Sequence, residues 1–265
     1  MYLKKYLMMT AAALCMLPLS AINPQNSKMK ELNVKKVSVA NIPVESVPAL
    51  LDEEKVAFQP VNTVNWAAFP YTPDVAFRIA HTEDAILLHF KVREASVRAV
   101  AGHDNGPVWE DACVEFFSVP AGDGVYYNME CNCAGTLLIG AGAGRGNRQH
   151  APQEVLDKVQ RWASLGREAF EERVGECSWE VALVVPYSAF FLHRITSLDG
   201  QTIRANFYKC GDKLQTPTSF PGIRLNWRSR TSIVRSSSAH CISSNFLPSC
   251  VSPYPSGFPV KPLCR

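Results

Sequence analysis

The chain has little net charge and, beyond its first thirty residues, no long apolar segment. Its 265 residues carry a formal net charge of only +3, which is too small to indicate a nucleic-acid partner or binding to an anionic membrane. No unbroken apolar run after residue 30 is long enough to span a bilayer. Hydrophobic residues make up 47% and charged residues 19%, as in an ordinary globular protein with a buried core. We therefore expect a monomeric globular domain without a membrane span.

The sequence also lacks the patterns of a metal centre and of common hydrolase sites. A glycosidase holds two carboxyl groups at a set separation, whereas Glu110, Asp111 and Glu115 crowd into one segment. No local signature of a serine or cysteine nucleophile is present. Five of the nine cysteines lie in strand-like segments without the paired spacing of a zinc site, and we expect them to be buried thiols: Cys113, Cys131, Cys133, Cys177 and Cys210.

The N-terminus differs from the rest of the chain. Two lysines precede an apolar run over residues 7–19, and a pair of small residues follows. Basic, apolar and small residues in this order are typical of a secretory signal. We therefore expect residues 1–28 to be a leader and the protein to be periplasmic or secreted. The alternative is a cytoplasmic protein that starts at Met29, and reduced cysteines argue mildly for it.

Short strands follow one another through the central part of the chain. Residues 43–54 predict a turn and one short helix, and for residues 151–163 a helix and a polar loop both stay open. Because no helices alternate with the strands, the pattern predicts an all-β fold. We expect an antiparallel, jelly-roll-like β-sandwich over residues 29–217. Its strands are predicted at residues 74–81, 85–92, 113–119, 125–133, 136–140, 178–185 and 202–210.

The composition changes at Thr218, where serine and proline become dominant and alternation stops. The plain interpretation is a disordered tail. A sharper hypothesis comes from the neighbouring reading frame, in which the codons after Pro217 can encode HFLSWNPIELEKPDFHRPEFFGALHFE followed by a stop. That peptide contains a Trp-Asn-Pro turn and a closing strand. We therefore expect residues 218–265 to be a frame-shifted, disordered tail, produced by the loss of one base near the Pro217 codon.

The densest group of residues suited to hold a ligand lies at residues 104–117. A loop ends in a strand there, and Trp109 precedes Glu115 by six residues. An aromatic ring can stack on the C–H bonds of a pyranose, while carboxylate, amide and guanidinium groups hold its hydroxyls. The alternative is that Trp109 anchors the core.

This segment resembles the family 9 carbohydrate-binding modules, specifically their stand-alone bacterial relatives. The resemblance implies that Trp109 forms one wall around a sugar and that Glu115 binds its hydroxyls. A second tryptophan wall comes from near the C-terminus in that family, and the shifted frame offers a candidate in Ser-Trp-Asn-Pro. The resemblance rests on matching blocks at residues 64–66, 69–71, 75–77, 105–117, 126–128, 179–181 and 205–212.

The resemblance further implies that the chain binds an oligo- or polysaccharide without catalysing a reaction. Modules of this family support polysaccharide breakdown by the glycoside hydrolases to which they are usually attached, so any such activity would come by association. No cofactor is expected, and a structural calcium ion stays open as an alternative.

Further polar candidates for the sugar site come from later segments. Asn128 and Asn132 share a strand face with Glu130. Arg145 lies in a glycine-rich segment, residues 140–148, which lacks the features of a phosphate-binding loop and is expected to be flexible. Lys209 ends a strand. For all of these a structural or solvated role stays open.

Other residues in and around the matching blocks are expected to be structural. Asp111 is predicted to be a turn or cap residue, and Trp66 and Trp179 are predicted to lie in the core.

Two other functions stay open beside sugar binding. A similar sandwich, of the DOMON type, holds haem b through methionine and histidine ligands, for which Met129, His103 and His150 could be proposed. The other is a structural or interaction domain whose sugar site has decayed, because a fold does not by itself fix a function.

Overall fold

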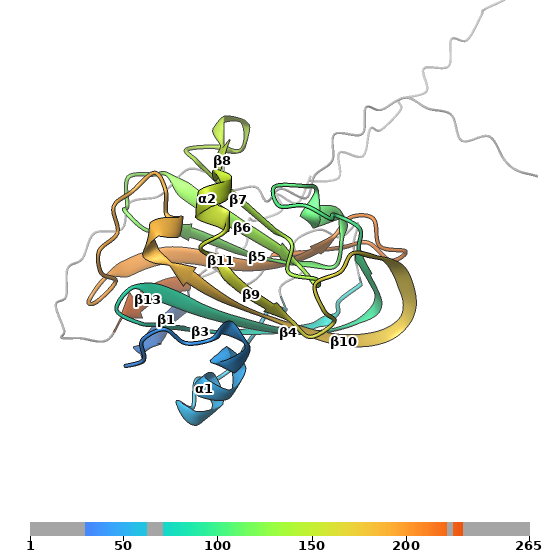
Figure 1. Ribbon diagram of the computed structural model, residues 1–265, viewed down its shortest axis with the longest axis horizontal. Coiled ribbons are helices and arrows are strands. Elements are labelled where there is room, and N and C mark those ends of the chain that lie inside the picture. The colour runs from blue at the N-terminus through green and yellow to red at the C-terminus, as the bar shows by residue number, and fades with distance from the viewer. Residues whose placement is uncertain (1–29, 63–70, 222–224, 230–265) are drawn as a thin grey trace, which may run out of the picture.

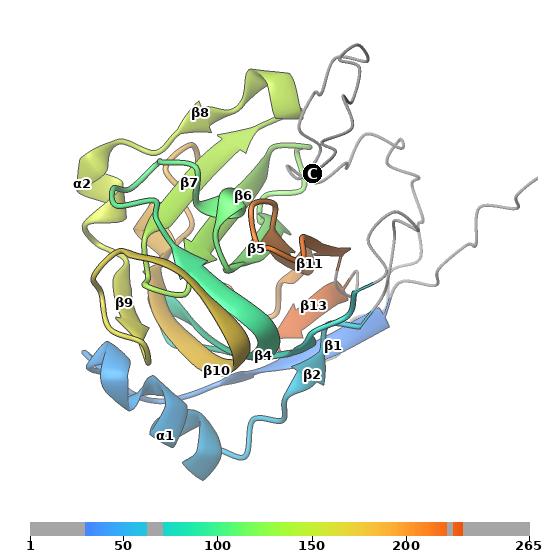
Figure 2. The same ribbon diagram turned by 90° about the vertical axis from the view of Figure 1, so that its right-hand side faces the viewer.

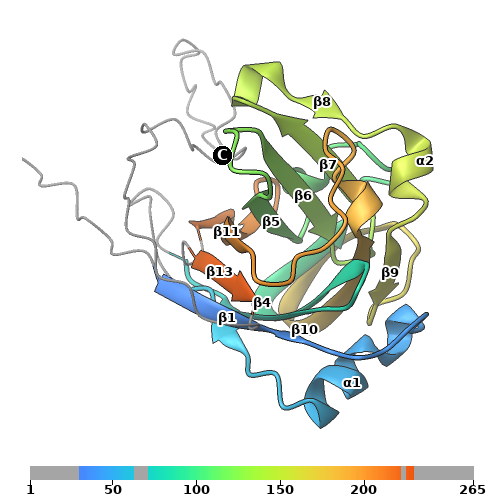
Figure 3. The ribbon, with the colours of Figure 1, turned by 90° about the vertical axis from the view of Figure 1, so that its left-hand side faces the viewer.

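The computed structural model describes residues 30–62, 71–221 and 225–229, which form two β-sheets packed face to face (Figure 1). The short strand β1 (Lys30–Lys36) belongs to both sheets, since it pairs in parallel with β13 of one sheet and β3 of the other. Figure 3 shows β1 beside β13 at the edge where the sheets meet. The predicted β-sandwich is therefore confirmed.

Sheet A, the sheet that carries the tryptophan and carboxylate segment, has the order β8-β7-β6-β5-β11-β13-β1, with β12 paired to β11. Apart from the pairing of β1 with β13, its neighbours are antiparallel. The strands are β5 (Cys113–Val119), β6 (Tyr126–Asn132), β7 (Leu137–Gly142), β8 (Gln149–His150), β11 (Thr202–Gly211), β12 (Thr218–Pro221) and β13 (Leu225–Ser229).

Sheet B has the order β1-β3-β4-β10-β9, with β2 paired to β3. The long pair β4 and β10 forms its centre, and Figure 2 shows that pair curving beneath sheet A. The strands are β2 (Gln59–Pro60), β3 (Asp74–His81), β4 (Ala85–Ala99), β9 (Gln160–Ala163) and β10 (Phe170–Pro186).

Aromatic side chains from both sheets fill the space between them. Phe207 of β11 stacks on Phe77 of β3 with ring centroids 3.5 Å apart, and Phe116 of β5 lies 5.1 Å from Phe207. Trp179 of β10 is buried in the same core, as predicted. Trp66 lies outside the described residues.

The helical elements are short and lie outside the two sheets. Helix α1 (Val47–Glu53) covers the outer face of sheet B, where the Arg78 guanidinium donates hydrogen bonds to Asp52 and to the Pro48 carbonyl oxygen. In the described part of the chain no helix is long and apolar enough to cross a membrane. The others are α2 (Gln153–Leu156), η1 (Val44–Ser46), η2 (Val108–Glu110), η3 (Arg145–Asn147) and η4 (Tyr187–Ala189).

Several boundaries differ from the sequence-based expectations. Strands β4 and β10 extend well beyond the predicted segments, because pairing with each other carries them through polar residues that break the alternation. The region 151–163 splits into α2 and β9. The expected disordered tail needs correction at its start, since residues 218–221 and 225–229 pair as β12 and β13. The other tail residues lie outside the described chain.

Candidate functional site

The two faces of sheet A have different chemistry. Along β5 the side chains of Val114 and Phe116 join the core, while Glu115 and Phe117 point the other way. The pairing of β5 with β6 and β11 sets polar and aromatic residues beside Glu115. This second side, called the outer face here, consists of Cys113, Glu115, Phe117, Tyr126, Asn128, Glu130, Leu138, Asn206, Tyr208 and Cys210.

Glu115 lies at the centre of the outer face. It is buried, and its cross-strand neighbours are Glu130 on β6 and Tyr208 on β11. The Cys210 thiol donates to Glu115 Oε1 at 3.0 Å. The Asn128 amide donates to a Glu130 carboxylate oxygen, so carboxylates and an amide lie side by side on this face. Such groups are suited to accept and donate directional hydrogen bonds to sugar hydroxyls.

Trp109 lies at the edge of the outer face. It belongs to η2, which directly precedes β5, and its side chain is partly buried. The Trp109 carbonyl oxygen accepts a hydrogen bond of 3.1 Å from the Asp212 amide, which ties η2 to the end of β11. The indole packs against an apolar cluster separate from the main core, formed by Ala101, Val108, Cys113, Leu138 and Cys210. The structure therefore brings Trp109 and Glu115 to the same side of sheet A.

Asp111 fixes the segment between Trp109 and β5. Its Oδ1 accepts hydrogen bonds of 3.0 Å from the Val100 amide and from Arg98 Nε, and its Oδ2 accepts one of 2.9 Å from the Ala101 amide. The carboxylate is buried, so these donors offset its loss of hydration. The prediction that Asp111 is structural is confirmed.

Asn132 is also committed to structure. Its Nδ2 donates to Asp111 Oδ2 at 3.0 Å, and its Oδ1 accepts from the Ala134 and Thr136 amides at 3.1 and 2.9 Å. The Asn132 side chain thus holds the β6–β7 turn and ties it to Asp111. The expectation that it could contact a sugar is therefore corrected.

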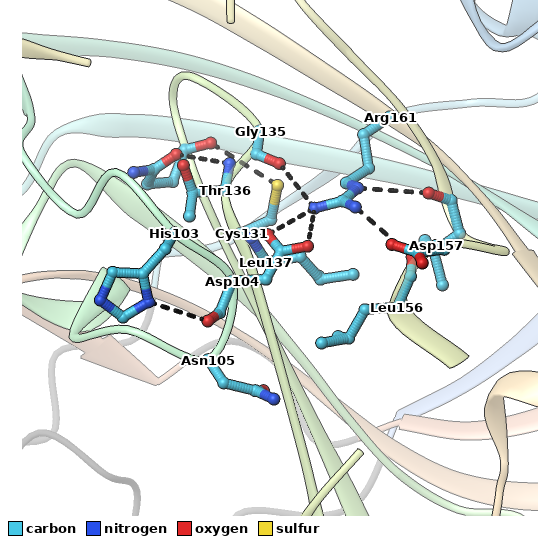
Figure 4. A network of polar contacts seen from close by, with 12 residues as sticks. His103, Asp104, Asn105, Cys131, Gly135, Thr136, Leu137, Leu156, Asp157 and Arg161 are labelled. Atoms are coloured by element: carbon cyan, nitrogen blue, oxygen red, sulfur yellow. Dashed lines mark hydrogen bonds and ion pairs between the residues drawn. The ribbon is translucent and has the colours of Figure 1, made fainter. Parts of the chain in front are cut away.

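A second anchor holds the loop before Trp109. The Asp104 carboxylate accepts hydrogen bonds from Arg161 Nη1 at 2.7 and 2.8 Å and from the Leu137 amide at 2.9 Å (Figure 4). Burial raises the pKa of Asp104, but the guanidinium and the amide together bring it below its ordinary value. The ion pair joins this loop to β9, and the hydrogen bond from the Leu137 amide joins it to β7. Together they hold in place the loop that leads to Trp109.

Lys209 lies on the core side of β11 and not on the outer face. Its Nζ forms an ion pair of 2.8 Å with Glu94 Oε2 on β4, and Trp179 Nε1 donates to Glu94 Oε1 at 2.7 Å. Burial alone would lower the pKa of Lys209, but the Glu94 carboxylate raises it, so the amine stays charged. The proposed role of Lys209 as a sugar ligand is corrected, because alternation along β11 points it into the core.

The remaining basic candidates lie in the loop between β7 and β8. Arg145 is exposed in η3. The Arg148 guanidinium lies 6.0 Å from the centre of the Tyr126 ring, and its side chain passes over Gly140, where a Cβ would come within 3.5 Å of Arg148 Cδ. A Cβ at Gly140 would make only an ordinary van der Waals contact with this arginine.

Some residues of the outer face were missed from the sequence. Tyr208 follows from alternation along β11 once the pairing with β5 is known. Asp212 comes next to Trp109 through the backbone contact, and burial, together with the Glu130 and Glu110 carboxylates, raises the pKa of Asp212 to about 7. The position of Tyr208 on the outer face and the raised pKa of Asp212 both depend on neighbours that lie far away in the sequence.

The residues considered for haem lie in different places. Met129 is buried in the core on β6, His103 Nδ1 contacts the Asp104 carbonyl oxygen at 3.0 Å, and His150 is exposed on β8. Within the described ranges, no group of three or more histidine, cysteine or acidic side chains is arranged to hold a metal ion. The five cysteines of the domain are free thiols, and all but the half-buried Cys177 are buried as expected.

Comparison with known proteins identifies the family. A protein from Bacteroides uniformis ATCC 8492 that has been proposed to bind carbohydrate shares 56% identity, with a TM-score of 0.73, over 75% of this chain and 99% of that one. Two structures of a family 9 module from Caldicellulosiruptor kristjanssonii, with cellotriose and with glucose, show 8% and 10% identity and TM-scores of 0.45 and 0.42 over 78% of this chain and 100% of theirs. Among curated proteins none matches. The family model of carbohydrate-binding family 9 matches residues 45–229. The chain therefore belongs to carbohydrate-binding family 9.

Proposed function

We propose that this chain is a non-catalytic module that binds one end or segment of an oligo- or polysaccharide on the outer face of sheet A. Trp109 supplies the stacking surface, and Glu115 and Asn128 supply hydrogen bonds to hydroxyl groups. Arg145 lies at the edge of the outer face and provides a further contact to the sugar. In this function the module is exported and supports polysaccharide breakdown by glycoside hydrolases.

The observation that carries the proposal is the proximity of an indole to a buried carboxylate on a face separate from the core. Trp109 packs against the apolar cluster that contains Cys210, and the Cys210 thiol donates to Glu115 Oε1. A sugar presents C–H bonds on its ring face and hydroxyls at its edge, so it needs an aromatic surface and acceptors at right angles to it. Two adjoining groups of these kinds match that need.

Calorimetric titration with xylo-, cello- and manno-oligosaccharides tests the proposal. We expect at least one series to bind and Trp109→Ala to lose most of that affinity. Trp162→Ala is the matched control, since Trp162 is also partly buried but packs on the far side of sheet B, and we expect it to bind as the unaltered chain does. Equal binding by Trp109→Ala, or no binding by the folded chain, would contradict the proposal.

A further inference from the structure

Two cysteines of the outer face lie directly opposite each other. Cys113 on β5 pairs in register with Cys210 on β11, and both side chains are buried in the apolar cluster that holds Trp109. The Cys210 thiol, opposite Cys113, also donates to Glu115 Oε1 at 3.0 Å. A covalent change at this pair therefore alters a hydrogen bond of Glu115.

The register of the pair suits a disulfide. Opposite residues in antiparallel strands have Cα atoms about 4.5–5.5 Å apart, which falls within the separation of about 4.4–6.8 Å that a disulfide spans. The other described cysteines have different neighbours: Cys131 pairs with Val114 and Leu137, and Cys177 pairs with Glu94. Among the cysteines in the described ranges, no second pair lies opposite in register.

We propose that Cys113 and Cys210 form a cross-strand disulfide when the chain folds in the presence of a small disulfide oxidant, and that this bond adjusts the sugar-binding face. One thiolate attacks the oxidant, a mixed disulfide forms, and the second thiolate displaces the remaining oxidant thiol. The two cysteine sulfurs lose two electrons and two protons in total, and the oxidant is reduced to two thiols. Burial raises the pKa of Cys113, so the folded chain reacts slowly and the bond forms during folding.

The consequence for Glu115 rests on the proposed function. In the dithiol form Glu115 Oε1 accepts the Cys210 S–H, whereas a disulfide has no S–H to donate. Glu115 Oε1 then has one donor fewer competing for it and accepts a sugar hydroxyl more strongly. We expect the disulfide form to bind its oligosaccharide about fivefold more tightly, the equivalent of one ordinary hydrogen bond.

Peptide mapping of the refolded full chain tests the bond directly. The chain is unfolded, refolded either with glutathione disulfide or with an excess of dithiothreitol, alkylated, and cleaved after lysine, arginine and glutamate. Residues 111–115 and 210–213 are then released as separate peptides, each with a single cysteine. We expect a disulfide-linked pair of these peptides after oxidative refolding, none after reductive refolding, and none from Cys210→Ala.

Cys131→Ala is the matched control and retains the linked peptides. If circular dichroism shows a native fold after oxidative refolding but both peptides carry the alkyl label, the proposal is overturned. The unaltered chain alone gives this answer even where Cys210→Ala does not fold.

Titration of both refolded forms separates this inference from the proposed function. Linked peptides without sugar binding by either form refute the sugar site and leave the disulfide standing. Sugar binding without linked peptides refutes the disulfide alone. Linked peptides with equal affinities of the two forms refute the coupling through Glu115.

Discussion

Glu115 of β5 lies directly opposite Glu130 of β6 on the outer face of sheet A, and both carboxylates are buried. Cross-strand pairs of like charge destabilise a sheet, and burial of a carboxylate adds to that cost. A purely structural face would gain stability from neutral side chains at these positions. Under the proposed function, the pair serves ligand binding.

The Glu115→Gln variant tests whether this carboxylate lowers stability and strengthens sugar binding. An amide keeps the shape of the side chain but loses the charge that strengthens a hydrogen bond to a hydroxyl group. We expect oligosaccharide affinity to fall about tenfold, in line with the loss of a hydrogen bond to a charged group. The midpoint of urea unfolding should stay at or above that of the unaltered chain. Glu154→Gln, at an exposed position in α2, is the control for both measurements.

The ion pair between Lys209 and Glu94 should matter for stability and not for sugar recognition. Both side chains are buried in the core, and removal of one partner leaves an uncompensated charge there. We expect Lys209→Met to lose about 3–5 kcal/mol of unfolding free energy in urea titrations. Lys209→Met combined with Glu94→Gln should recover part of that loss. A Lys209→Met chain that stays folded but no longer binds sugar would instead return Lys209 to the binding site.

The fold should lose stability in acid because of His89. The ring is fully buried on β4, where it accepts from Arg78 Nε at 3.0 Å and contacts Glu180 Oε2 at 2.7 Å. Burial is the main reason that the pKa of His89 falls from 6.5 to about 4. Between these values the unfolded chain binds a proton that the folded chain does not. This contribution to stability is therefore complete above pH 6.5 and is lost as the pH falls toward 4.

Urea unfolding at several pH values between 4 and 7.5 measures that loss. We expect the unfolding free energy to fall by at most about 1.4 kcal/mol per pH unit from this residue. Other groups also titrate in this range, so the comparison is with His89→Asn, which should show a shallower dependence on pH. Parallel curves for the two proteins would exclude His89 as the cause.

Local sequence patterns predicted the strands of the fold more accurately than the residues of the site. Strands β3 and β5 were predicted residue for residue because alternation and flanking turns agree there. Trp109 and Glu115 were chosen as candidates from one local segment, and the structure places both on the same side of sheet A. Lys209 was misplaced because its partner Glu94 comes from the other sheet. Asn132 was misplaced because its partners lie in a turn that a strand pattern does not predict. The first error comes from a contact between distant segments, and the second from a local turn.

Restoration of the reading frame tests the origin of the tail. If one base was lost near the Pro217 codon, the genomic sequence there permits the shifted reading, and a chain with the base restored ends in the strand FFGALHFE. A further strand would add backbone pairing and core contacts, so we expect a higher thermal midpoint and less aggregation. The restored Trp-Asn-Pro segment should also strengthen oligosaccharide binding, because it offers a second aromatic wall opposite Trp109. Bases at codons 217–219 that forbid the shifted frame would rule out the hypothesis, and the altered composition after residue 217 would then belong to the natural chain.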